Sequence, residues 1–447
     1  MIIDDKYNIC NIYNYIKRVK GIATGASPTD AWIITFKDNV YYKKEKINKG
    51  FIKIFADKSF FKLVKNNDEN YDDLENAIEG LMYESNVYNL VVTPLVDLKI
   101  CPNFIRSLGV GKLCSYDNLF KMLDNHYYTK NRKLRSQLVK KRLKRSINNN
   151  ILDYYSDNYG FSDVSIRKSR NRNNEIDVDI NKIKFNIILT ETFDNIMSFH
   201  DLLVSNYIQE INIFNILFQI FVACYTFSLS KGVHNDLHTG NIMIRPLDKP
   251  LNLVYFINKK KYIIKVQYLV YIYDFDRAYV KKLGDNKSLY MYENYSQNNE
   301  FINNKDAIKL LCSVYKYTQN KLYLKCLTDK EQHLKNLIKL YSLEKGCNFQ
   351  LKNNKPVSSS FFSYYNDIYT ILYKFSENLP EIKIDKLSDI HEVYVCDKEV
   401  FDSNGHINKT KLNKIRKEMI SKLNYKNKSI RRRSSTKSTR KRRRSIK

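Results

Sequence analysis

The chain has 447 residues and a formal net charge of +29, from 76 Lys and Arg against 47 Asp and Glu. Its 43% apolar and 13% aromatic content excludes a wholly disordered chain, because so much apolar surface can form a core. With only 12 Gly and 7 Pro it is not collagen-like, and its length suits one large domain or two to three smaller ones.

The N-terminal part has the sequence pattern of strands around one helix. Aromatic and β-branched residues predict strands at 31–36 and 51–56. Apolar residues at helical spacing then predict a helix over 72–90. A short strand is expected at 103–106, and strand character returns at 185–190.

Two polar, basic segments stand apart from this pattern. We expect a surface insertion at about 111–184 and a disordered tail at 424–447. Nine basic residues and no acid occupy 130–145, and 11 basic residues and no acid occupy 428–447. Such charge attracts polyanions, so the tail is predicted to bind nucleic acid or another polyanion. A nuclear address and a solvated charge run without a partner are the alternatives.

Helical patterns dominate the C-terminal part. Residues 211–230 carry no formal charge, but Asn212, Asn215 and Gln219 recur along one helical face. This pattern indicates a buried helix rather than a membrane span. The exception to the helices is 251–273, which is predicted to form a hairpin. Strands first and helices afterwards predict an α+β chain with two lobes.

The cysteines and the N-terminus indicate an intracellular protein. The eight cysteines show no Cys-x-x-Cys spacing, which predicts neither a zinc site nor a disulfide framework. Acidic residues at the start, with no apolar run behind them, are not typical of a secretory signal. We therefore expect a reducing compartment.

The segment 232–244 concentrates the polar groups of a candidate catalytic loop. It contains His234, Asp236, His238 and Asn241 in a tight loop after the apolar helix. An Asp with an Asn five residues later suits phosphoryl transfer, because the Asp can accept a hydroxyl proton and the Asn amide oxygen can bind Mg²⁺.

A second acidic element lies at 273–277, after an apolar strand. Its Asp274 follows Asp236 by 38 residues and could hold the Mg²⁺ that bridges the phosphates of a nucleotide. The two elements together predict a nucleotide-dependent phosphotransferase site.

In this order, His234, Asp236 and Asn241 followed by Asp274 and Phe275 resemble the catalytic and metal loops of the protein-kinase-like fold. The residues of these two loops more closely resemble those of protein kinases of large nucleocytoplasmic DNA viruses, mimivirus-like ones in particular. The resemblance implies an ATP- and Mg²⁺-dependent serine/threonine protein kinase that acts on a protein substrate. A viral protein of this kind would act in the host cytoplasm or the virion.

The resemblance also implies a domain division. It predicts a bilobal α+β fold with insertions, in which a small β-rich N-lobe spans 1–190 and includes the polar insertion. A larger helical C-lobe with the catalytic and metal loops would span 191–423, and the tail would follow at 424–447.

Further residues match landmarks of the family in order along the chain. Lys53 resembles the strand-borne Lys that binds the nucleotide phosphates, and Glu84 resembles the Glu that orients it, with Glu79 as the fallback. Glu191 resembles the hinge position that meets adenine. Asp306 resembles the helix Asp that braces the catalytic loop.

Several positions depart from the family pattern. The Gly-rich loop keeps only Gly21 and Gly25, where backbone N–H groups near Gly25 and Ser27 are still expected to cradle phosphate. Asn235 replaces the Arg that receives an activation-loop phosphate, so we expect no need for such phosphorylation. His238 replaces the Lys that steadies the transferring phosphate and is expected to take part of its role.

Two alternatives stay open. His-x-Asp-Leu-His-x-Gly-Asn at 234–241, followed by Asp274 and Asp276, also resembles aminoglycoside and choline phosphotransferases, which phosphorylate small-molecule hydroxyls. The chain could instead be an inactive kinase-like scaffold that binds nucleic acid through its basic segments. The reduced Gly-rich loop favours that second alternative.

Overall fold

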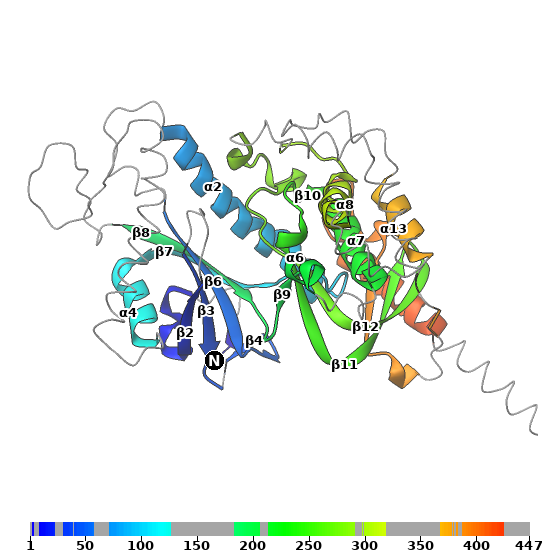
Figure 1. The fold of residues 1–447 in the computed structure, drawn as a ribbon, viewed down its shortest axis with the longest axis horizontal. Coiled ribbons are helices and arrows are strands. Elements are labelled where there is room, and N and C mark those ends of the chain that lie inside the picture. The colour runs from blue at the N-terminus through cyan, green and yellow to red at the C-terminus, as the bar shows by residue number, and fades with distance from the viewer. Residues whose placement is uncertain are drawn as a thin grey trace, which may run out of the picture.

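The computed structural model describes residues 2–3, 9–22, 30–38, 40–57, 71–126, 183–205, 213–290, 297, 299–318, 367–377, 379, 381–382 and 387–423. Gly25, Ser27, most of the predicted insertion and the tail 424–447 lie outside these residues. The described chain is mixed α+β, with a sheet-rich N-terminal part and more helices later (Figure 1).

Five antiparallel strands form the N-terminal sheet, in the order β2-β3-β6-β8-β7. They are β2 (Ile16–Ile22), β3 (Asp30–Phe36), β6 (Lys49–Ala56), β7 (Ser107–Ser115) and β8 (Lys184–Glu191). The strands predicted at 31–36, 51–56 and 185–190 are confirmed. The register places Lys53 in the interior strand β6, opposite Ile188 of β8.

One long helix lies between β6 and β7 in the chain and reaches toward the C-terminal part (Figure 1). It begins as α2 (Tyr71–Val87), continues through the π-helical turn η2 (Tyr88–Val92) and ends in α3 (Thr93–Asp97). The helix predicted over 72–90 is therefore confirmed. A π-helical turn rotates the side chains that follow it, and such turns are frequent at functional sites.

Two predictions for the N-terminal part are wrong. Residues 103–106 form no strand, since Phe104 makes an isolated bridge to Ile272 and β7 begins at Ser107. Residues 111–126, assigned to the polar insertion, belong to β7 and α4 (Tyr116–His126). Because β7 pairs with β8 and α4 buries apolar side chains, this stretch is part of the core despite its polar neighbourhood.

The cysteine spacing predicted no disulfide framework, and the structure contains one bond that this prediction left out. Cys10 of η1 (Ile9–Tyr15) and Cys114 of β7 are bonded, although 104 positions separate them. Sequence spacing carries no information about such a long-range pair. Cys101, Cys224 and Cys396 are buried free thiols.

A long antiparallel hairpin organises the C-terminal part. Its strands are β11 (Ile242–Ile257) and β12 (Lys260–Ile272), so the predicted hairpin is confirmed but starts earlier than residue 251. Asn258 and Lys259 at its tip have φ values of +46° and +67°, as a two-residue hairpin turn of the primed type requires. Strand β14 (Glu392–Cys396) runs parallel to β11, and β9 (Met197–Ser198) pairs with β11 in the antiparallel direction.

Helices pack beside this hairpin (Figure 1). They are α6 (Phe199–Val204), α7 (Ile213–Leu229), α8 (Lys305–Thr318), α13 (Ile368–Ser376) and a helix over 409–423. Helix α7 is buried along almost its whole length and packs against β12 and α13, as predicted for a buried helix. Among the described residues, no helix combines the length and apolar character needed to cross a bilayer.

Short elements complete the described chain. The strands are β1 (Ile2–Ile3), β4 (Tyr41–Tyr42), β5 (Glu45–Lys46), β10 (Gly232–Val233) and β13 (Tyr279–Val280). The 3₁₀ turns are η5 (Thr239–Asn241), η6 (Lys281–Leu283), η9 (Leu387–Asp389) and η10 (Lys398–Val400). Strand β10, which directly precedes the candidate catalytic loop, pairs with β13.

The amides on the face of α7 fasten the hairpin to the segment before β7. Gln219 is fully buried; its Nε2 donates to the carbonyl of Tyr268 at 3.0 Å. Its Oε1 accepts from Asn103 Nδ2 at 3.1 Å and from the Val270 N–H at 3.3 Å. Asn215 Nδ2 adds one bond to the carbonyl of Lys265 at 3.0 Å. These amides therefore serve packing within the fold.

Replacing Gln219 should strongly destabilise the protein. Gln219→Leu leaves the buried Val270 N–H and one N–H of the Asn103 amide without their acceptor, which should cost about 2–4 kcal/mol of unfolding free energy. Asn215→Leu, which gives up the bond to the carbonyl of Lys265, should cost about half as much. Urea unfolding of both variants measures the difference, and an equal or reversed order would contradict this account.

Candidate active site

The loop between β10 and η5 carries Asp236, and α8 anchors the backbone of this loop. Asp306 of α8 accepts the His234 N–H at 2.7 Å on one carboxylate oxygen and the Asn235 N–H at 3.0 Å on the other. Asn235 has a φ of +64°, which an Asn tolerates better than most residues. The buried Asp306 carboxylate thus fixes the backbone that presents Asp236.

Lys53 meets two carboxylates from distant segments. Its Nζ lies 2.8 Å from Glu84 Oε2 on α2 and 2.8 Å from Asp274 Oδ1, which follows β12. The Lys53 and Glu84 side chains are 12% and 2% exposed, whereas the Asp274 side chain is 34% exposed and partly accessible to solvent. Glu79, the fallback partner for Lys53, instead pairs with Lys287 at 2.9 Å.

The charged groups at this cluster shift one another's pKa values. Burial acts to lower the Lys53 pKa, but Asp274 and Glu84 outweigh it and raise that pKa well above its usual range. Burial raises the pKa of Glu84, against the effect of Lys53, while Lys53 outweighs burial at Asp274 and lowers its pKa. Burial and Asp274 raise the pKa of Asp276 to about 6. Glu84 and Asp274 thus hold Lys53 between them, and the charge of Asp276 also acts on Lys53.

Asp274 is fixed in an unusual backbone conformation. Its φ is +67°, and its N–H donates to the Tyr88 hydroxyl at 3.1 Å, from the π-helical turn after α2. His234 Nε2 contacts the carbonyl of the preceding Tyr273 at 2.9 Å. The metal-loop backbone is thus bound by both the helix and the catalytic loop. Tyr88 could not be foreseen from sequence, because its role depends on the π turn.

Helix α2 also holds the segment that follows Asp274. The Tyr83 hydroxyl accepts the Val280 N–H at 2.8 Å and donates to the carbonyl of Gly284 at 2.9 Å. At Gly80 the two segments approach so closely that an added Cβ would lie 2.5 Å from the Cβ of Ser288. Since Glu84 follows Tyr83, these contacts also set the position of the carboxylate that pairs with Lys53.

Both oxygens of the Asp236 carboxylate have partners. Oδ1 accepts from Gln297 Nε2 at 3.1 Å, and Oδ2 lies 3.2 Å from Arg277 Nη1. His238 Nε2 is farther, at 3.9 Å from Oδ2. Sequence reasoning assigned no role to Arg277 or Gln297. Arg277 could have been noticed, because it is the first basic residue after Asp274.

Asn241 lies between the two loops. Its Nδ2 donates to the Asp236 carbonyl at 3.0 Å, and its own carbonyl accepts the Tyr273 N–H at 3.3 Å. The first bond uses the amide nitrogen, so the bond to the Asp236 backbone does not occupy the Asn241 amide oxygen. No group of three His, Cys, Asp or Glu side chains among the described residues is arranged to hold a metal. Mg²⁺ needs fewer, because it is bound through one or two carboxylates plus phosphates and water.

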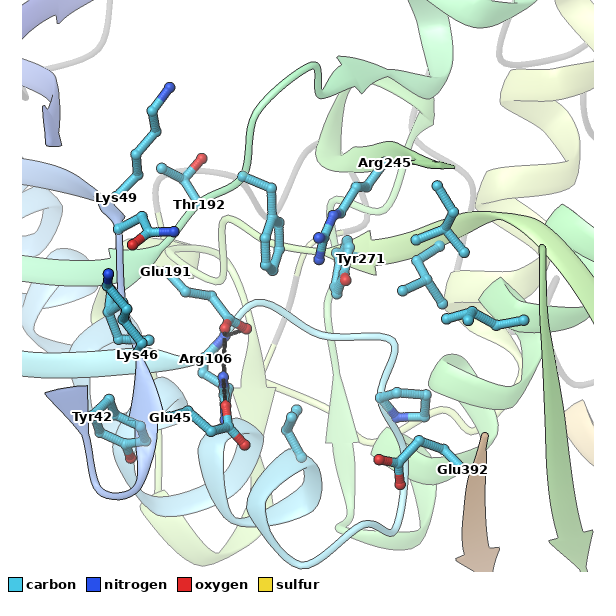
Figure 2. A pocket seen from close by; sticks show the side chains of 18 of the residues that line it. Tyr42, Glu45, Lys46, Lys49, Arg106, Glu191, Thr192, Arg245, Tyr271 and Glu392 are labelled. Atoms are coloured by element: carbon cyan, nitrogen blue, oxygen red, sulfur yellow. Dashed lines mark hydrogen bonds and ion pairs between the residues drawn. The ribbon is translucent and has the colours of Figure 1, made fainter. Parts of the chain in front are cut away.

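The Glu191 side chain is turned toward Arg106, and its predicted contact with adenine stays a prediction. Its carboxylate lies 2.9 Å from Arg106 Nη2 and accepts the Arg106 N–H at 3.0 Å. Figure 2 shows the pair in a groove of about 1280 Å³ that Glu45, Arg245 and Tyr271 also line. The Glu191 N–H is bound to the Arg106 carbonyl at 3.0 Å. The side chain of Glu191 is therefore a structural partner of Arg106.

No family model matches the chain, and no curated protein matches it. Among solved structures, the chain is similar to "WaaP in complex with acyl carrier protein" at 7% identity and a TM-score of 0.26. The match covers 81% of this chain and 90% of that one. A similarity at this TM-score says nothing about residue roles or substrates.

Two lysines of α8 fill the space beneath Asn235. Lys305 Nζ donates to Asn235 Oδ1 at 2.6 Å, and Lys309 Nζ donates to the Asn235 carbonyl. Lys305 is 1% exposed, and burial together with nearby Lys309 lowers its pKa to about 7. Asn235 stands where the kinases that this loop resembles carry an Arg, and its side-chain amide is buried.

Lys305 should make the unfolding free energy rise with pH between about 7 and 10. Its pKa is about 7 in the folded chain and ~10.4 when unfolded, so the unfolded state binds more protons in this window. The slope from this group approaches about 1.4 kcal/mol per pH unit at most. Lys305→Met should lose it and exposed Lys249→Met should not; urea unfolding from pH 7 to 9.5 tests this, and equal slopes in all three proteins would sink it.

Proposed function

We propose that the protein transfers the γ-phosphoryl group of ATP, with Mg²⁺, to serine or threonine hydroxyls of a protein substrate. The observation that carries the proposal is the meeting of Lys53, Glu84 and Asp274 beside the loop of Asp236 and Asn241. Residues far apart in the chain thereby assemble the positioning and electrostatic groups that phosphoryl transfer needs.

Each side chain then has a defined task. Lys53, held by Glu84, binds phosphate oxygens, and Asp236 orients the acceptor hydroxyl and takes its proton. Asn241 and Asp274 would hold Mg²⁺, which neutralises charge on the phosphates. Asp274 contacts Lys53 and is 34% exposed, so its carboxylate is accessible to a bound cation.

A phosphotransferase for small-molecule hydroxyls is the second candidate. Asp276 favours it, because this carboxylate adds to the charge beside Asp274 where a Gly is usual in protein kinases. The acceptor that receives label separates the two candidates. A scaffold without catalysis remains the third hypothesis, and the intact Lys53, Asp236, Asn241 and Asp274 oppose it.

Label transfer from γ-labelled ATP tests the proposal. A basic protein, casein and small aminoalcohols serve as acceptors, beside Asp236→Asn and the exposed Asp248→Asn as a matched control. Asp236→Asn should lose about 10²–10⁴-fold in rate and keep the thermal shift produced by Mg²⁺ and ATP. Label on aminoalcohols alone would support the second candidate, and no label and no thermal shift would leave the scaffold.

Activity should not depend on phosphorylation of the chain. Asn235 offers no cation to a phosphate, because it is buried and bound by Lys305 and Lys309. The contacts of Tyr83 and Tyr88 hold α2 and the metal loop together without one. Phosphatase treatment should leave the rate within about two-fold of untreated protein, since no charge-assisted contact is removed. Loss of activity that phosphorylation restores would refute this expectation.

A further inference from the structure

The catalytic loop lacks the cation that phosphoryl transfer requires beside Asp236. His238 stands two residues after Asp236, and its Nδ1 accepts the Gly240 N–H at 3.0 Å at the start of η5. The ring proton of neutral His238 is therefore on Nε2. Because Nδ1 accepts this bond it carries no proton, and His238 in this geometry supplies no full positive charge.

Arg277 supplies a permanent charge at the same place from the other loop. Its Nη1 lies 3.2 Å from Asp236 Oδ2, and a guanidinium stays protonated at any working pH. The side chains of Arg277 and Asp236 are 29% and 22% exposed, so both are partly accessible to solvent. The buried Gln297 contacts both, through Nε2 to Asp236 and through Oε1 to Arg277 at 3.5 Å.

The other nearby ammonium groups have different tasks. Lys309 lies beneath the loop and donates to the Asn235 carbonyl, and burial lowers its pKa. Lys53 is held between Glu84 and Asp274. Arg277 is therefore the described cation that combines contact with Asp236, partial exposure and a fixed charge.

We propose that Arg277 is a catalytic residue that binds the transferring phosphoryl group and replaces the missing lysine of the catalytic loop. The inference rests on the proposed phosphotransfer. The acceptor oxygen forms a bond to the γ-phosphorus while the bond from that phosphorus to the β–γ bridging oxygen breaks, and ADP leaves with the electron pair. The hydroxyl proton goes to Asp236, and the Arg277 guanidinium stabilises the charge on the equatorial phosphoryl oxygens.

The role belongs to a charge and not to one residue, so it should be transferable. Arg277→Gln removes the guanidinium and should lower kcat about 10²–10³-fold, while the thermal shift with Mg²⁺ and ATP changes little. Adding His238→Lys to Arg277→Gln places an ammonium where the resembling kinases have it. The double variant should regain at least about ten-fold in kcat, since the charge again lies beside Asp236.

Controls and a second measurement separate this role from folding. Arg18→Gln, on an exposed position of β2, should keep the wild-type rate. Guanidinium ions at millimolar concentration should partly restore Arg277→Ala but not Asp236→Asn. A wild-type rate or a gain in Arg277→Gln overturns the inference, as does a loss that neither His238→Lys nor guanidinium repairs. Wild-type protein that binds ATP but labels no acceptor refutes the proposed function itself, and the inference falls with it.

Discussion

The buried ammonium of Lys53 is the constraint on which the rest of the site depends. It pairs with residues 31 and 221 positions away in the chain, one on α2 and one after β12. A charge with so little solvent must keep its partners, since removal of one partner from a buried pair costs about 3–5 kcal/mol. The register of β6, the position of α2 and the start of the metal loop are therefore set together.

Helix α2 satisfies this constraint with more than one side chain. Tyr83 binds the backbone after the metal loop, Gly80 allows close approach at Ser288, and Tyr88 binds the Asp274 N–H. A rotation of α2 that withdrew Glu84 would break all of these contacts at once. The helix and the metal loop thus behave as one unit. This supports a site that is assembled before any ligand or modification arrives.

The sequence predicted these features where the signal is local. Lys53 stands in an apolar strand, and Asp236, Asn241 and Asp274 stand at fixed spacing in two loops, so their assembly could be foreseen. Features that depend on a distant partner could not. Glu191 turns to Arg106, and Cys10 reaches Cys114, because the fold brings segments together that no spacing connects.

The position of Arg277 follows from how the metal loop is anchored. Phe275 is fully buried, against the rings of Tyr88, Phe227 and His234. With this ring fixed, the residues on either side of it keep a set distance. Asp274 faces Lys53, and Arg277 faces Asp236. The Arg277 guanidinium is thereby tied to the same anchored segment as Asp274. Under the proposed function, charge stabilisation by Arg277 and cation binding by Asp274 would share one rigid support, which fits the preorganisation that electrostatic catalysis requires.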